Sequence, residues 1–206
     1  MSHHEEWDKV SLQQDFLKLS RCMERFFKLK HFVTRNVFKN IYEINYDKLY
    51  EQKIRLILFD LDNTLIPYHV KELGDKEKNF LTSLKEKGFT VGIVSNNRRK
   101  RVLKALNGFD GLILSMSYKP LIFKVKRKIK KLSFNLNEVV LVGDQLMTDV
   151  LCANRLGIAS VLVKPIDRST EKKSTIRNRK REIRIIRRLQ KTNPEFVRIY
   201  KNECGN

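Results

Sequence analysis

Residues 54–64 read Ile-Arg-Leu-Ile-Leu-Phe-Asp-Leu-Asp-Asn-Thr, an apolar run that leads directly into two carboxylates and a hydroxyl. Leu and Ile dominate the run without polar alternation, as expected for a parallel strand buried on both faces. Four further runs have the same character: 91–94, 112–114, 139–142 and 161–163. We therefore predict a parallel sheet in which 54–59 is one strand.

The segments between these runs have the apolar spacing of helices, with positions three and four apart on one face. Gly157 is a suitable residue to follow the last of these helices. Alternating strands and helices predict an α/β sandwich with right-handed crossovers. The residues expected to share a helix face are Phe80, Leu81 and Leu84; Val102, Leu103 and Leu106; Ile122, Val125, Ile129 and Leu132; and Val150, Leu151 and Asn154.

The chain divides by composition into three parts. Residues 12–32 have a helical pattern with one apolar side, and residues 164–191 carry twelve basic and three acidic residues. We predict an N-terminal helical arm over 1–31, a core domain over 32–168 and a basic, helical C-terminal tail over 169–206.

Composition also limits where the protein acts. No stretch of about 18 uncharged apolar residues is present to form a transmembrane helix, and residues 1–10 lack the apolar run of a secretory signal. Cys22, Cys152 and Cys204 are far apart and form no CxxC pair, which favours reduced thiols over a disulfide framework or a zinc site. We therefore expect a cytoplasmic protein.

The chain is strongly basic. Lys and Arg number 43 against 23 Asp and Glu, which gives a formal net charge of +20. Such an excess favours a polyanionic partner, either nucleic acid or an anionic membrane face. A basic surface that is merely solvated is the alternative, and the sequence leaves it open.

Polar residues stand at or just beyond the ends of four predicted strands. Because ligands of parallel α/β sheets bind beyond the carboxyl ends of the strands, we expect these residues to gather at one rim. They are Asp60 and Asp62, Ser95-Asn96-Asn97, Lys119, and Asp144 with Asp149.

Several carboxylates at one rim repel one another unless a cation lies among them. Hard oxygen ligands suit Mg²⁺, which also binds phosphate oxygen. A carboxylate can attack phosphorus once a metal and a lysine neutralise the repulsion between the two anions, and a second acid can protonate the leaving oxygen. The set therefore indicates phosphoryl transfer. A calcium loop starting at Asp60 is excluded because Leu65 stands where that loop needs glycine.

Four segments, in this order, resemble the motifs of the haloacid dehalogenase (HAD) superfamily. They are Asp-Leu-Asp-Asn-Thr-Leu at 60–65, Ser-Asn-Asn at 95–97, Lys-Pro at 119–120 and Gly-Asp-Gln-Leu-Met-Thr-Asp at 143–149. The combination looks like subfamily IIIA and, within it, the YqeG-type phosphatases, which are similar to the mitochondrial phosphatidylglycerophosphate phosphatase. The resemblance spans residues 32–189 and implies a HAD-like Rossmannoid three-layer sandwich.

The resemblance implies three catalytic roles beside a phosphate ester. Asp60 would be the nucleophile and a metal ligand. Asp62 would be the general acid and base, and its backbone carbonyl would bind the metal. Lys119 would neutralise charge on both the nucleophile and the phosphoryl group.

The resemblance also implies binding roles. Ser95 would bind phosphate with its side chain, and Asn96 would do so through its backbone. Asp144 would complete the protein ligands of Mg²⁺. Asp149 would lie behind those ligands or pair with Lys119.

The spacing of the motifs leaves no room for an inserted cap domain. Thirty-five residues separate Asp60 from Ser95, and twenty-four separate Ser95 from Lys119, enough in each case for one helix and one strand. We therefore expect an open site, suited to a substrate presented on a surface such as a lipid head group, a protein side chain or a nucleic-acid end.

The leading hypothesis, implied by the resemblance, is hydrolysis of phosphatidylglycerophosphate at the inner face of the membrane. The alternatives are a phosphatase of a soluble or nucleic-acid phosphate and a basic nucleic-acid-binding protein on a HAD scaffold.

The tail fits the membrane hypothesis through its pattern. Ile176, Ile183, Ile186 and Leu189 recur near helical spacing among basic residues, so this helix could lie on an anionic membrane. Packing of the last three against the core is the other interpretation.

Overall fold

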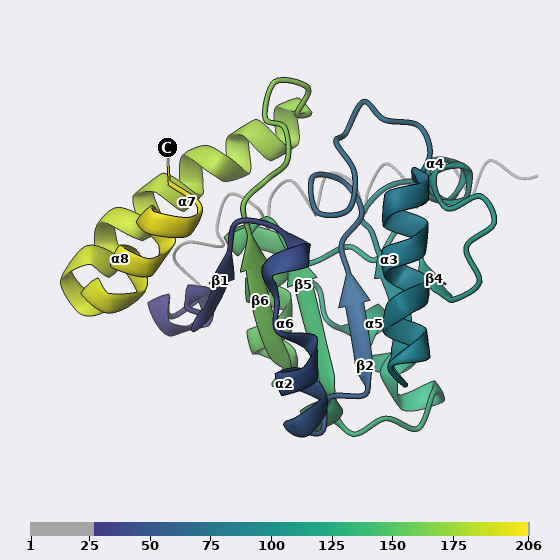
Figure 1. Ribbon diagram of the computed structural model, residues 1–206. Coiled ribbons are helices and arrows are strands. Elements are labelled where there is room, and N and C mark those ends of the chain that lie inside the picture. The colour runs from purple at the N-terminus through teal and green to yellow at the C-terminus, as the bar shows by residue number, and fades with distance from the viewer. Residues whose placement is uncertain (1–26, 206) are drawn as a thin grey trace, which may run out of the picture.

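The computed structural model describes residues 27–205, which are built around a six-stranded parallel sheet (Figure 1). The strand order is β1-β6-β5-β2-β3-β4. The strands are β1 (Asn36–Phe38), β2 (Leu56–Phe59), β3 (Thr90–Val94), β4 (Leu112–Leu114), β5 (Val139–Gly143) and β6 (Ala159–Val163). The parallel sheet predicted from the five apolar runs is confirmed.

One strand of the sheet was missed from the sequence. β1 pairs with β6 at the edge of the sheet and is three residues long. Only Val37 among its residues is buried, so no apolar run marks the strand.

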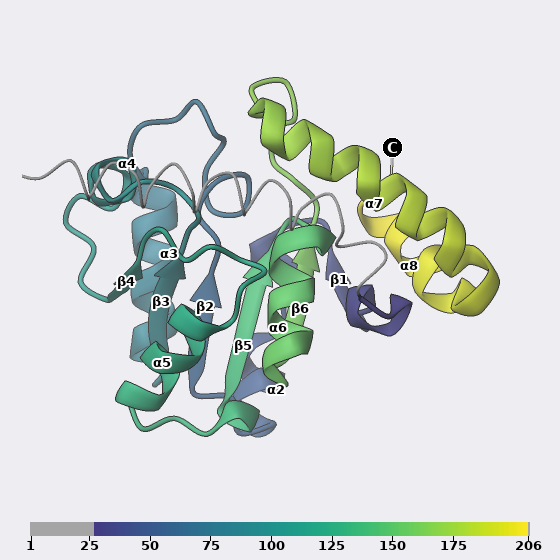
Figure 2. The same cartoon turned by 180° about the vertical axis from the view of Figure 1, so that it is seen from behind.

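Helices cover both faces of the sheet and complete three layers (Figures 1 and 2). One face carries α2 (Tyr46–Glu51), α3 (Asp75–Glu86) and α4 (Arg99–Ala105), and the other carries α5 (Phe123–Lys131) and α6 (Leu151–Leu156). Short helical turns complete the connections: η1 (Leu29–Phe32), η2 (Ile41–Glu43), η3 (Leu136–Glu138) and the π-helical η4 (Leu146–Val150). Among residues 27–205, no helix is both long and apolar enough to cross a membrane.

Most residues predicted to lie on the buried faces of helices are at least partly buried, but the prediction for Leu103 is wrong. Leu103 is 41% exposed, because α4 turns Val102 and Ala105 toward the core and leaves Leu103 on its outer side. Gly157 follows α6 with a φ of 76°, as predicted for a residue that ends a helix. The helix predicted over 12–32 lies outside the described residues as far as residue 26, and its end is the short turn η1.

The C-terminal part forms two helices, α7 (Lys173–Thr192) and α8 (Pro194–Glu203), which pack together beyond the β1 edge of the sheet (Figure 1). Ile185 and Leu189 of α7 are fully buried in an apolar cluster with Val37 of β1 and Phe196 of α8. The domain limits at 31/32 and 168/169 stay predictions.

The apolar stripe predicted for the tail divides between two environments. Ile186 and Leu189 turn inward, while Ile176 and Ile183 are 43% and 53% exposed. Part of the stripe therefore packs against the core, and part of it faces solvent between basic residues.

β2 is the strand at which the sheet order changes side. The chain adds β3 and β4 on one side of β2, and then β5 and β6 on the other. β2 pairs with β3 on one side and with β5 on the other, and Phe59 lies beside Val142 of β5. Crevices that bind ligands form at such a reversal, outside the carboxyl ends of the strands. The residues that follow β2 and β5 therefore leave the sheet side by side.

Candidate active site

Asp60, Lys119 and Asp149 form a buried ionic group beyond β2. The ammonium of Lys119 donates to Oδ1 of Asp60 at 2.7 Å, lies 2.6 Å from Oδ1 of Asp149, and donates to the carbonyl of Val94 at 2.7 Å. The backbone N–H of Asp60 bonds to the carbonyl of Val142 at 2.8 Å, so the sheet itself fixes this residue. Of the two positions left open for Asp149, the structure shows the one paired with Lys119.

Burial and the neighbouring charges together set the pKa values in this group. Burial raises the pKa of Asp60 well above its usual range; Lys119 lowers it, and Asp149 and Asp144 raise it further. Burial alone would lower the pKa of Lys119, but Asp149 and Asp60 together raise it above its usual value. Lys119 therefore stays charged beside the carboxylates.

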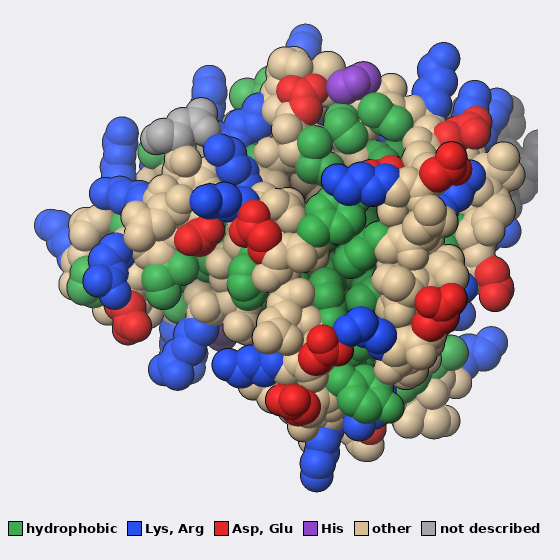
Figure 3. Space-filling view, in the orientation of Figure 1, with side chains coloured by type: hydrophobic (Ala, Val, Ile, Leu, Met, Phe, Trp, Pro, Cys, Tyr) green, Lys and Arg blue, Asp and Glu red, His purple; other side chains and the backbone are tan. Residues whose placement is uncertain are grey.

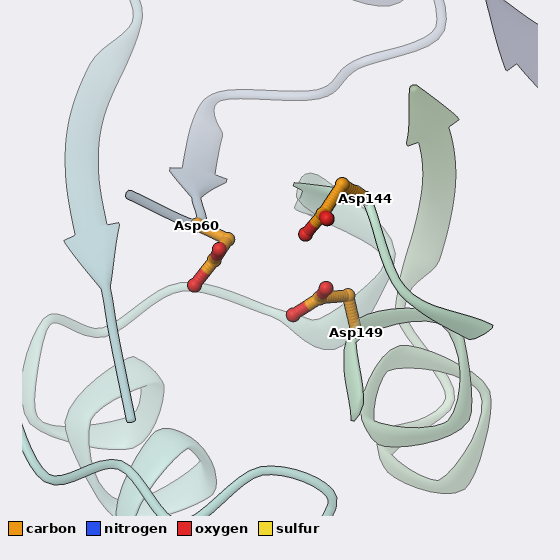
Figure 4. A group of neighbouring side chains, drawn as sticks. All are labelled: Asp60, Asp144 and Asp149. Atoms are coloured by element: carbon orange, nitrogen blue, oxygen red, sulfur yellow. The ribbon is translucent and has the colours of Figure 1, made fainter. Parts of the chain in front are cut away.

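Asp60, Asp144 and Asp149 have carboxylate oxygens that all lie within 4.8 Å of one another, and Figure 4 shows them turned toward a common space. Oδ1 of Asp144 is buried and accepts no hydrogen bond from the described residues. Burial raises the pKa of Asp144 and Arg179 lowers it, and the net result is a pKa of about 7. Clustered hard oxygens, one of them unpartnered, fit a small divalent cation.

The carboxylate of Asp62 stands apart from that group. Its Oδ2 accepts from the side-chain amide of Asn97 at 2.9 Å, and its Oδ1 accepts from Nη2 of Arg101 at 3.0 Å. Arg101 also donates to the carbonyls of Tyr68 and Val70, so the loop after β2 and the helix α4 are joined at Asp62. Two fixed donors hold this carboxylate in one orientation at the cavity wall.

Ser95 and Asn96 follow β3 and take different positions. Ser95 is buried, and its hydroxyl accepts from the backbone N–H of Asn97 at 3.1 Å. The side chain of Asn96 accepts from the N–H of Lys119 at 2.7 Å and donates to its carbonyl at 2.9 Å. The Asn96 side chain therefore positions the backbone of Lys119.

A cavity of about 790 Å³ opens beside these residues. Asp60, Asp62, Ser95 and Lys119 line it from the ends of the strands, and the segment 171–178 lines it from the C-terminal part. The start of α7 thus forms a wall of the cavity, which the division of the chain by composition did not anticipate.

Three features of the site were missed from the sequence: the donors Asn97 and Arg101 on Asp62, and Arg179 of α7 on Asp144. Asn97 belongs to a motif already identified, and its position next to Asn96 was the available signal. Arg101 and Arg179 stand in basic segments, where no local pattern separates them from solvated neighbours.

The family model described as haloacid dehalogenase-like hydrolase matches residues 68–163. A protein of Bacillus subtilis (strain 168) named as probable phosphatase YqeG is 33% identical over 162 residues, which cover 79% of this chain and 94% of that protein.

Two solved structures are similar to this chain at lower sequence identity. The 3-deoxy-D-manno-octulosonate 8-phosphate phosphatase of Moraxella catarrhalis, in complex with magnesium and phosphate ions, is 20% identical with a TM-score of 0.39, over 48% of this chain and 64% of that one. A HAD phosphatase of Thermococcus onnurineus is 26% identical with a TM-score of 0.39, over 48% and 49%.

Proposed function

This chain belongs to the haloacid dehalogenase-like hydrolases and is a phosphatase of phosphoric monoesters, and we propose that Asp60 carries the phosphoryl group during its reaction. The observation that carries this proposal is the buried ionic group of Asp60, Lys119 and Asp149 at the end of the central strand β2. Lys119 holds Oδ1 of Asp60, and Oδ2 accepts no hydrogen bond from the described residues. That free oxygen is available to attack phosphorus.

The proposed reaction has two steps on the same phosphorus atom. An oxygen of Asp60 attacks phosphorus, the bond to the leaving alcohol breaks, and the carboxyl of Asp62 gives its proton to the departing oxygen. Water then attacks the aspartyl phosphate, Asp62 takes a proton from that water, and the bond to Asp60 breaks as inorganic phosphate leaves. Ser95 and the backbone of Asn96 bind the phosphoryl oxygens throughout.

We propose Mg²⁺ as the metal of this site. Asp60, Asp144 and the backbone carbonyl of Asp62 would hold the ion, whose charge would shield the phosphate from the carboxylates. The unpartnered Oδ1 of Asp144 and the short distances among the three carboxylates support this assignment.

The substrate that we propose is the lipid phosphatidylglycerophosphate. The intervals from Asp60 to Ser95 and from Ser95 to Lys119 each hold one helix and one strand, so no domain inserted there closes the cavity over the substrate. Arg98, Lys172 and Arg177 line the cavity, where they would attract an anionic head group.

The proposed setting is the inner face of the membrane, with the protein cytoplasmic and bound peripherally. Figure 3 shows that Lys and Arg side chains outnumber acidic ones over the α7 and α8 side of the molecule. Each basic residue near an anionic lipid surface contributes about 1 kcal/mol to binding. The exposed Ile176 and Ile183 stand among these charges and would enter the lipid interface.

A panel of phosphate esters tests both the proposed nucleophile and the proposed substrate. Wild type, Asp60→Asn and the surface control Asp110→Asn would be assayed with phosphatidylglycerophosphate in mixed micelles, sugar phosphates, nucleotides and a 5′-phosphorylated oligonucleotide. We expect Asp60→Asn to lose hydrolysis of every ester while Asp110→Asn keeps it. Wild-type rates from folded Asp60→Asn would contradict the nucleophile, and preference for a soluble or nucleic-acid phosphate would contradict the lipid substrate alone.

A further inference from the structure

Arg179 of α7 reaches the carboxylate that follows β5. Its Nη1 donates to the carbonyl of Asp144 at 2.7 Å, and its Nη2 bonds to Oδ2 of the same residue. The Arg179 side chain is 13% exposed, and that of Asp144 is fully buried. A residue 35 positions later in the chain therefore binds both the backbone and the side chain of Asp144.

Two further carboxylates hold Arg179 in this position. Glu171 accepts from Nε at 3.0 Å and from Nη2 at 2.9 Å, and Glu182 accepts from Nη1 at 3.2 Å. Glu182 also accepts from the N–H of Met147 at 3.1 Å, and Glu171 accepts from the amide of Asn63 at 3.2 Å. All three guanidinium nitrogens are used, so the side chain has one orientation that satisfies its partners.

The two carboxylate oxygens of Asp144 therefore have different environments. Oδ2 is taken by Arg179, while Oδ1 is buried and accepts no hydrogen bond from residues 27–205. One carboxylate oxygen of Asp144 lies within 4.8 Å of oxygens of Asp60 and Asp149. Arg179 therefore occupies one oxygen of Asp144 and leaves the other without a partner.

We propose that Arg179 is a positioning residue that makes this site favour Mg²⁺ over Ca²⁺ by reserving one oxygen of Asp144. The inference rests on the proposed function, in that the carboxylates hold a divalent cation. Mg²⁺ requires six ligands in near-octahedral geometry, whereas Ca²⁺ takes six to eight and accepts both oxygens of one carboxylate. A carboxylate limited to one oxygen suits the smaller ion.

The test measures equilibrium binding of each ion separately, without substrate. Isothermal titration calorimetry would give the Kd of Mg²⁺ and of Ca²⁺ for wild type, Arg179→Met, Arg179→Lys and the neighbouring surface control Lys180→Met. We expect the ratio Kd(Ca²⁺)/Kd(Mg²⁺) to fall about tenfold in both Arg179 variants, in keeping with the size of effects from residues behind metal ligands. Lys180 is exposed on the same helix, and its variant should keep the wild-type ratio.

The ratio isolates the positioning effect. Loss of the Arg179 charge would strengthen the binding of both Mg²⁺ and Ca²⁺, and partial loss of folded protein would weaken the binding of both. Neither effect changes the ratio of the two Kd values to first order. Arg179→Lys keeps the charge that Glu171 and Glu182 require, and it provides a folded variant if Arg179→Met does not fold. A lysine has no planar fork with which to hold Asp144, Glu171 and Glu182 together.

Each outcome decides something. A wild-type ratio in folded Arg179→Lys would overturn the proposal, whatever its effect on activity. A wild-type protein that bound neither ion would instead overturn the metal assignment on which the proposal rests. A lowered ratio in both Arg179 variants, with Lys180→Met unchanged, would support it.

Discussion

The ammonium of Lys119 lies 2.7 Å from Oδ1 of Asp60, and the side chains of both residues are at least nine-tenths buried. The same ammonium lies 2.6 Å from Asp149, so one cation faces two carboxylates. A buried charge that loses its partner is costly, because water does not replace the lost interaction. We therefore expect the pair to be needed both for folding and for turnover.

Lys119→Met should impair turnover and stability together. We expect turnover to fall on the order of 10²–10³-fold, because the phosphoryl charge loses its neutralising group. The free energy of unfolding should fall by about 3–5 kcal/mol, because Asp60 and Asp149 are left unpaired. Steady-state kinetics and urea denaturation measure the two effects, with the exposed Lys104→Met as control. Undiminished turnover would contradict the role of Lys119.

The loss of rate caused by Asp62→Asn should depend on the leaving group of the substrate. A general acid contributes about 10²–10⁴-fold where the departing oxygen needs a proton. We therefore expect a large loss of the phosphorylation rate with alkyl phosphates and a much smaller one with activated aryl phosphates, whose phenolate leaves unprotonated. Rapid-quench measurement of alcohol release in the first turnover checks this. An equal loss on both classes would show that Asp62 acts in some other way.

Metal binding should become more stabilising as pH rises. The pKa of Asp144 is raised from 3.8 to about 7, chiefly by burial. Between those values the folded metal-free protein holds a proton that the unfolded chain has lost, so this contribution to stability is greatest at low pH and disappears as pH rises through about 7. Mg²⁺ would bind the deprotonated carboxylate, so it would have to displace that proton below about pH 7.

The melting temperature with and without Mg²⁺ tests this linkage. We expect Mg²⁺ to raise Tm only slightly at about pH 5.5 and clearly more at about pH 8, since proton and metal compete for Asp144. An equal shift at both pH values would mean that no ligand titrates in this range.

The exposed face of α7 should bind anionic lipid. Removing three charges with Arg187→Gln, Arg188→Gln and Lys191→Gln should release the protein from phosphatidylglycerol vesicles at low salt, because each charge contributes about 1 kcal/mol. Flotation measures binding, and wild-type binding should weaken as salt is added.

The matched control removes three charges from α5, which lies away from α7 and from the β1 edge of the sheet (Figure 2). Lys126→Gln, Arg127→Gln and Lys130→Gln lower the net charge equally, so they should leave flotation intact if location matters. Equal loss from both triple variants would attribute binding to total charge, and no loss from the α7 variant would remove the membrane role of that helix.

The sheet could be predicted because five of its strands are apolar runs, of which all but β4 are largely buried, and the polar residues at their ends followed from that. β1 escaped because a three-residue edge strand with Val37 as its sole buried residue has no periodicity to detect. Leu103 was misassigned because residues 102 and 103 are both apolar, and spacing alone does not show which one faces the core.

Side-chain partners were harder to predict than strand ends. The sequence left Asp149 two possible positions, and only the distance to Lys119 distinguishes them. Arg179 is one of twelve basic residues in 164–191, and its burial depends on Glu171 and Glu182 meeting Asp144 across the fold. These contacts depend on the tertiary structure and cannot be predicted from the pattern of charges along the sequence.

The most direct test of the account is to find where the phosphoryl group resides during turnover. Asp62→Asn should slow the attack of water while an activated aryl phosphate still phosphorylates the enzyme, so the intermediate should accumulate. Acid quenching followed by peptide mass mapping of that variant, with Mg²⁺ present, locates the modification. We predict close to one phosphoryl group per site, on Asp60, whereas a phosphoryl group on another residue, or steady release of the aryl alcohol with no phosphorylated peptide, would contradict the account.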